Sequence, residues 1–186
     1  EVPLQLTRTN KASSTSAAFT PDGKYVSFLA KREEKTQLYI ISILGGEAIA
    51  VTNDTDGISS YDWSPDGTRI VYSKPQTDSK AEKSTKERFG AFAIEGEEYK
   101  QNHLWLLNFN YDSVFLSWHL PCYPVKKDSS KTNETKAQEC FSLPVAKQLT
   151  EGNFSVSGFS WCPDGKQIAF NRQSNPLILS GISADI

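Results

Sequence analysis

The sequence predicts an all-β fold of four-stranded antiparallel sheets, because one turn sequence occurs three times and strand-like segments recur at matching distances from it. In each copy an aromatic residue and a small residue precede Pro-Asp-Gly, and an apolar segment follows. Proline presets φ, aspartate bonds the local backbone and glycine accepts a positive φ, so each copy is expected to connect two antiparallel strands. The turn residues are Pro21, Asp22 and Gly23, then Pro65, Asp66 and Gly67, then Pro163, Asp164 and Gly165.

Two further pairs of similar segments extend this pattern. Residues 37–40 resemble residues 102–105 and predict third strands, whereas Val51-Thr52 and Leu149-Thr150 predict the ends of fourth strands. The interval between the first two turns matches the ~40–45 residues of one four-stranded propeller blade. We therefore predict a partial β-propeller of about three blades, in which Trp63, Trp105 and Trp161 pack between neighbouring sheets.

The interval between the second and third turns is about twice as long, yet it holds only one more third-strand and one more fourth-strand pattern. We therefore predict one blade with two insertions, at 74–101 and 111–144. Opposite charges four residues apart, Glu82 with Lys86 and Lys83 with Glu87, favour a short solvated helix in the first insertion. The predicted parts of a single domain, 1–186, are a blade end at 1–10, a blade at 16–53, the insertion-bearing blade at 60–151 and the start of another blade at 156–186.

Composition limits the classes of partner. A net charge of −2 gives no electrostatic reason to expect nucleic acid or an anionic membrane, and the apolar runs are too short to span a bilayer. The sequence holds no methionine, begins inside a predicted fourth strand and stops where a third strand should start, so we expect a fragment of a longer protein. The pattern predicts no metal and no cofactor. The cytoplasm is favoured as the compartment, with the periplasm or secretion as alternatives.

Several residues imitate functional sites. The segment Gly158–Trp161 resembles the start of a G-x-S-x-G nucleophile elbow, but Trp161 aligns with Trp63, so Ser160 is expected in a hairpin strand. His103 lies in a predicted strand, where a structural or substrate-facing role is expected. No catalytic residue is predicted.

Acidic residues invite other interpretations. The segment Asn53–Gly57 faintly resembles a calcium loop, but Trp63 stands where an EF-hand needs its bidentate glutamate, so we expect a polar loop. Each turn aspartate is expected to bond its own backbone. Glu97 and Glu98, beside Tyr99, are suited to hold a cation, and a solvated charge run is the alternative. Cys122 and Cys140 pair only in an oxidising compartment, and reduced thiols are the plainer interpretation.

The first insertion carries a family resemblance. The segments Glu87–Phe92, Glu97–Tyr99 and His103–Trp105 are similar to an insertion in the β-propeller of the prolyl oligopeptidase family of serine peptidases, nearest the acylaminoacyl-peptidases and related dipeptidyl aminopeptidases. Residues 172–186 resemble the entry into the next blade of that family. Residues 111–144 have no counterpart there.

The resemblance implies that the propeller and the catalytic domain have separate roles. In that family the propeller caps an α/β-hydrolase domain that carries the catalytic Ser, Asp and His, and nothing in this chain matches that domain. The resemblance therefore implies a non-catalytic propeller that gates short peptides, with a hydrolase domain of the same parent chain as its partner. Some members hold a substrate's amino terminus with propeller acids, for which Glu97, Glu98 and Tyr99 are the candidates.

The Pro-Asp-Gly repeat also occurs in TolB-type propellers. The alternative function is therefore a TolB-like propeller that binds protein partners and catalyses nothing.

Overall fold

A computed structural model describes residues 5–7, 13–77, 84, 87–88, 90, 100–119 and 143–174. Its strands form three antiparallel sheets in which each strand pairs with the next one along the chain. The first sheet contains β1 (Ser14–Phe19), β2 (Tyr25–Lys31), β3 (Thr36–Ser42) and β4 (Ile49–Ala50). The second contains β5 (Ser60–Trp63), β6 (Arg69–Pro75), β7 (Asn102–Asn108) and β8 (Lys147–Gln148), and the third contains β9 (Ser155–Trp161) and β10 (Ile168–Gln173).

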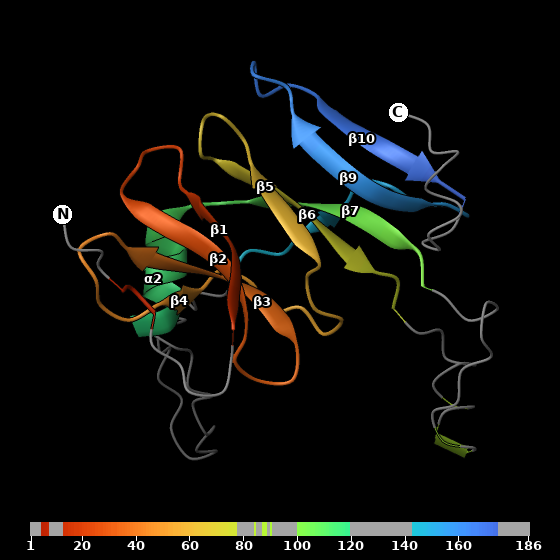
Figure 1. Cartoon of the computed structure of the whole chain (residues 1–186), viewed down its shortest axis with the longest axis horizontal. Helices are drawn as coiled ribbons and strands as arrows, with labels where there is room; N and C mark the ends of the chain where they lie inside the picture. Colours follow the sequence, from red (N-terminus) through yellow and green to blue (C-terminus); the bar gives the residue numbers. More distant parts are fainter. Residues whose placement is uncertain are drawn as a thin grey trace, which may run out of the picture.

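The three sheets follow one another in space as they do in the chain. The sheet β5–β8 lies between the other two, and the helix α2 (Tyr111–His119) covers part of the sheet β1–β4 (Figure 1). The prediction of a mainly β fold with four-stranded antiparallel sheets is confirmed, and the segments predicted as third strands are β3 and β7. The number of blades stays a prediction.

The three Pro-Asp-Gly turns have the same backbone geometry. In the second turn the N–H of Gly67 donates to the carbonyl oxygen of Ser64 at 2.9 Å, and Gly67 has a φ of 70°. The corresponding bonds of Gly23 and Gly165 are both 2.8 Å, with φ of 69° and 68°. A positive φ disfavours other residues, so glycine is the residue that permits this turn.

Each turn aspartate accepts hydrogen bonds from groups of its own turn. The hydroxyl of Ser64 donates to Asp66 Oδ1 at 2.6 Å, and the N–H of Thr68 donates to the same oxygen at 3.1 Å. These bonds favour the carboxylate and lower the pKa of Asp66 from its ordinary 3.8 to about 2, with Ser64 the largest cause. Thr20 acts in the same way on Asp22, whereas the pKa of Asp164 is lowered first by the N–H of Lys166 and then by Cys162.

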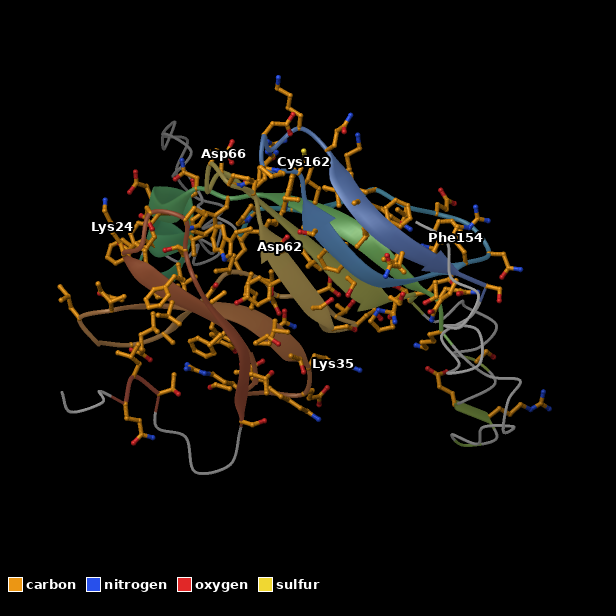
Figure 2. All side chains as sticks on the ribbon, turned by 45° about the horizontal axis from the view of Figure 1, so that its top comes forward. Lys24, Lys35, Asp62, Asp66, Phe154 and Cys162 are labelled. Carbon is orange, nitrogen blue, oxygen red and sulfur yellow. The ribbon has the colours of Figure 1, made fainter. Side chains whose placement is uncertain are left out.

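Successive sheets are joined by tryptophan side chains. The indole N–H of Trp63 donates to the hydroxyl of Ser27 in β2 at 2.9 Å, and the hydroxyl of Tyr61 donates to the same oxygen at 2.9 Å. We call the boundary between two successive sheets a seam. At the seam between the second and third sheets, the backbone N–H of Trp161 donates to Asp62 Oδ2 at 3.1 Å, and its indole N–H donates to the Asp62 carbonyl at 3.3 Å. Asp62 accordingly lies where β5 faces β9 (Figure 2).

The apolar core sits between the sheets. One cluster joins the first two sheets through buried side chains that include Leu29, Trp63 and Ile70, and another joins the second and third through Val71, Leu104 and Trp161. Trp105 packs against the first cluster from a partly buried position. The predicted packing of these tryptophans between neighbouring sheets is therefore confirmed.

The helix α2 is not among the predicted elements. Residues 111–144 are predicted as an insertion, whereas Tyr111–His119 form a helix whose Val114 is fully buried in the core between the first two sheets. Asn110 caps it, because its Oδ1 accepts the N–H of Ser113 at 3.1 Å. Asp112 in the first turn suits the positive end of the helix dipole. These two residues were the available sequence signal.

The first insertion also differs from the prediction in one respect. The strand β6 continues through Lys74 and Pro75, which pair with His103 and Asn102, so both residues belong to the sheet rather than to the insertion. Ser84, Glu87 and Arg88 are helical and exposed. The predicted helical charge pairs include residues outside the described part of the chain and stay predictions.

Replacement of Asp66 by asparagine should make stability less sensitive to acid. The pKa of Asp66 is lower in the folded state than in the unfolded state, so its contribution is present above pH 3.8 and is lost as the pH falls toward about 2. Urea titrations across this pH window should show a shallower loss of the free energy of unfolding in Asp66→Asn than in the wild-type chain. Identical slopes in the two proteins would contradict the bonding scheme of this turn.

Candidate functional site

The most strongly charged buried site lies at the far end of β6 from its Pro-Asp-Gly turn. We call it the polar cluster and define it as Asp54, Asp56, Tyr72, Lys74 and Thr77. The ammonium of Lys74 lies 2.8 Å from Asp54 Oδ2 and 3.6 Å from Asp56 Oδ2, and the three side chains are 9%, 12% and 14% exposed. Thr77 donates its hydroxyl to Asp56 at 2.6 Å. Two carboxylates therefore share one ammonium in a poorly hydrated place.

The loop that carries these carboxylates is held by Gln37 of β3. The side-chain amide of Gln37 donates to the carbonyl of Asp54 at 2.7 Å, and its oxygen accepts the N–H of Asp54 at 2.9 Å. Asp54 Oδ1 then accepts the N–H of Asp56 at 3.0 Å, which folds the loop on itself. In the segment Asn53–Gly57, the carboxylates of Asp54 and Asp56 therefore face Lys74. The part of the chain that the structure describes holds no group of three or more His, Cys, Asp or Glu placed to bind a metal ion.

Two aromatic side chains complete the surroundings of Lys74. Its ammonium lies 4.1 Å from the ring centroid of Trp105, close enough for a cation–π contact. The hydroxyl of Tyr72 lies 3.4 Å from Asp54 Oδ2, and the pKa of Tyr72 is raised by burial first and by the Asp54 charge second. Tyr72 therefore keeps its proton, and the polar cluster carries one net negative charge.

A cavity of about 480 Å³ opens beside the polar cluster. Asp54, Tyr72 and Trp105 form its polar wall, and Leu143–Ala146, which precede β8, form an apolar wall with Leu107. This volume is within the ~300–1,000 Å³ of small-molecule pockets. Asp54 is already paired with Lys74, and the opposite wall is apolar, so the cavity suits an apolar group.

His103 occupies a structural position. It is buried in β7, its Nδ1 lies 3.4 Å from the hydroxyl of Thr150, and its ring packs edge-on against Phe154. Gln37 holds the matching place in β3, where its side-chain oxygen accepts the hydroxyl of Thr52 at 2.8 Å. Burial is the main cause that lowers the pKa of His103, so the imidazole is predominantly neutral near pH 7.

Ser160 does not lie on a nucleophile elbow. It is an exposed residue of β9 that pairs with Ala169 of β10, and a turn and a strand follow it rather than a helix. In the described part of the chain, the polar contact of the His103 ring is with Thr150 and not with a serine. The preference for a hairpin strand at Ser160 is confirmed.

The predicted substrate-binding residues Glu97, Glu98 and Tyr99 lie outside the described residues. The two ends of their insertion are nonetheless fixed beside the polar cluster. The N–H of Gln76 donates to the carbonyl of Gln101 at 2.7 Å, and Thr77 is bonded to Asp56. Lys74 was not predicted as a site residue, although a lysine near the end of β6, separated from its apolar residues by Ser73 alone, was a usable signal.

Cys162 has a free thiol, and Cys122 and Cys140 lie outside the described residues. Among the residues that the structure describes, no helix is both long enough and apolar enough to cross a bilayer.

Comparison with known proteins gives one informative relative. No protein-family model matches the chain. Over 163 residues it is 28% identical to "Uncharacterized peptidase YuxL" of Bacillus subtilis (strain 168), an alignment that covers 85% of this chain and 22% of that protein. The chain thus spans about a fifth of the length of this relative. A solved structure, putative TolB from Agrobacterium tumefaciens, has a TM-score of 0.41 and 16% identity, over 55% of this chain and 32% of that one.

Replacement of Lys74 by methionine should destabilise the chain strongly. The change keeps an unbranched side chain of similar length but leaves two poorly hydrated carboxylates without a counter-charge, which typically costs about 3–5 kcal/mol. Urea unfolding should show this loss, whereas the control Lys166→Met, at an exposed position, should stay within about 0.5 kcal/mol of wild type. Equal stability of the two variants would mean that the polar cluster does not hold this end of the sheets together.

Proposed function

We propose that the chain is the non-catalytic propeller segment of a serine peptidase and that it gates the access of short peptides to an α/β-hydrolase domain of the same parent protein. The observation that carries the proposal is the 28% identity to a peptidase over 85% of the chain. The sequence resemblance to acylaminoacyl-peptidases and dipeptidyl aminopeptidases adds the substrate class, namely peptides recognised at their amino terminus.

The arrangement of the sheets supports a gating role. Hydrogen bonds and apolar side chains join the successive sheets, so the strands form a stiff frame. Selectivity in such a frame comes from the connections between strands, which tolerate changes of length and sequence. The first residues of the insertion, Gln76 and Thr77, are hydrogen-bonded to Gln101 and to Asp56 of the polar cluster. The point at which the insertion leaves the sheet is therefore fixed.

Within this proposal, Glu97 and Glu98 bind the ammonium of a peptide's amino terminus. Charge-assisted hydrogen bonds of this kind are about twice as strong as neutral ones. Catalytic chemistry is assigned to the hydrolase domain, in agreement with the placement of His103 and Ser160 in ordinary strand positions.

The proposal is tested with the full-length parent protein and aminoacyl and acyl-aminoacyl chromogenic substrates. Release of the chromophore should be abolished by a serine-directed phosphonate, and the 186-residue chain alone should release none. Activity of the isolated chain that is lost in Ser160→Ala would contradict the non-catalytic role. A full-length product without a hydrolase domain and without turnover would contradict the peptidase assignment and favour the TolB-like interaction module.

A further inference from the structure

A second, smaller cavity lies between α2 and the sheet β1–β4, away from the polar cluster. Its volume is about 270 Å³. The apolar part of its lining comes from Ile40, Ala48 and Ile49, and the remainder includes Tyr25, Tyr111 and the exposed residue Glu47. Because small-molecule pockets typically measure ~300–1,000 Å³, this volume fits one long side chain better than a complete small ligand.

The aromatic wall of this cavity is ordered by stacking. The rings of Tyr25 and Tyr111 have centroids 4.5 Å apart with 24° between their planes, and the ring of Phe115 follows that of Tyr111 at 6.0 Å. Burial is the main cause that raises the pKa of Tyr111 to about 12, with a hydrogen bond to Tyr25 as the second cause. Tyr111 is therefore uncharged at neutral pH, and the two tyrosines present electron-rich rings, which attract cations.

The described charged residues at or beside this cavity include two acids, Glu47 in its lining and Asp112 in α2, and one cation, Lys24, which precedes Tyr25 in the chain. The ion pairs between described residues involve Asp54, Asp56 and Asp66, and none involves Glu47. Asp112, in the first turn of α2, adds to the negative potential at Tyr111. Lys24, the cation nearest to Tyr25 along the chain, exerts its charge on Asp22 in the adjacent turn. The cavity thus combines aromatic rings and a carboxylate that has no described counter-ion.

Elsewhere in the chain, aromatic rings are contacted by cations of the chain itself. Lys74 lies over Trp105 and pairs with Asp54, and Arg32 lies 4.4 Å from the ring centroid of Tyr39. Arg69 lies 4.9 Å from the ring centroid of Trp161 and 3.7 Å from Asp66. In each case a cation of the chain itself contacts an aromatic ring. Lys74 and Arg69 also pair with an aspartate, Asp54 and Asp66 respectively.

We propose that the cavity beneath α2 is a binding site for an arginine side chain of a peptide or protein partner. The alkyl stem packs on Ile40 and Ile49, and the guanidinium lies between the carboxylate of Glu47 and the ring of Tyr25. A guanidinium suits this place better than an ammonium, because its planar donors match a carboxylate while its face stacks on an aromatic ring. The site goes beyond the proposed peptidase role, since it uses no residue of the polar cluster or of the first insertion.

The test is an NMR titration of the ¹⁵N-labelled 186-residue chain with N-acetylarginine amide at an ionic strength of about 0.01 M, where charges are weakly screened. A ligand of this size in one small pocket should bind with a dissociation constant on the order of 1 mM. The backbone N–H signals of residues 40–49 and of Tyr25 should shift saturably. N-acetylcitrulline amide has nearly the same shape without the charge and should bind at least about fivefold more weakly.

Variants separate the carboxylate from general electrostatics. Glu47→Gln, at an exposed position, should weaken arginine binding at least about fivefold, whereas Glu34→Gln, an exposed acid between β2 and β3, should leave it unchanged. The spectra themselves report whether each variant is folded. Three results would overturn the proposal: no saturable shift, equal affinity for the citrulline amide, or unchanged affinity in a folded Glu47→Gln variant.

Discussion

The hydrogen bond from the indole of Trp63 to the hydroxyl of Ser27 joins the first two sheets, and the remaining architecture depends on contacts of this kind. A four-stranded sheet has two faces to cover, and apolar packing alone leaves two sheets free to slide because it is not directional. Ser27 is fully buried, accepts from both Trp63 and Tyr61 and donates to the carbonyl of Ala18. One hydroxyl therefore fixes the position of β5 against β1 and β2. Trp161 and Asp62 do the same at the next seam.

Once the sheets are fixed, both candidate sites follow from their connections. The polar cluster forms where the β4–β5 loop meets the end of β6, and the smaller cavity forms where α2 returns over the first sheet. Cys162 and Phe154 mark opposite ends of β9, and the Pro-Asp-Gly turns share the Cys162 end (Figure 2). The turn end is closed by short local bonds. The opposite end carries the base of the first insertion, which is a connection between strands and lies apart from the contacts that join the sheets.

Much of this fold follows from local sequence, and most of the candidate site does not. Pro-Asp-Gly determines its turn through bonds within a few residues, and β3 and β7 follow from their apolar patterns. The fourth strands β4 and β8 end at Ala50 and Gln148, two residues before the predicted Thr52 and Thr150. The hydroxyls of these two threonines accept the N–H groups of Leu38 and Leu104. The role of Lys74 arises only when a loop about twenty residues earlier folds onto it, a non-local pairing that no periodicity encodes. The helix α2 was not predicted, because residues 111–144 fell in an interval too long for one blade and were assigned to an insertion, although the buried Val114 of α2 is part of the core. The proposed roles of Glu97, Glu98 and Tyr99 stay predictions.

The most direct test of this account is a double-mutant cycle at the first seam, with Ser27→Ala and Trp63→Phe measured singly and together by urea unfolding. If the indole–hydroxyl bond couples the two sheets, the two changes should show a coupling free energy of about 1–2 kcal/mol. As a control, Ser157→Ala, at an exposed position of β9, should be additive with Trp63→Phe. Additivity of Ser27→Ala and Trp63→Phe within about 0.3–0.5 kcal/mol would contradict the account, because it would mean that apolar packing alone aligns the sheets.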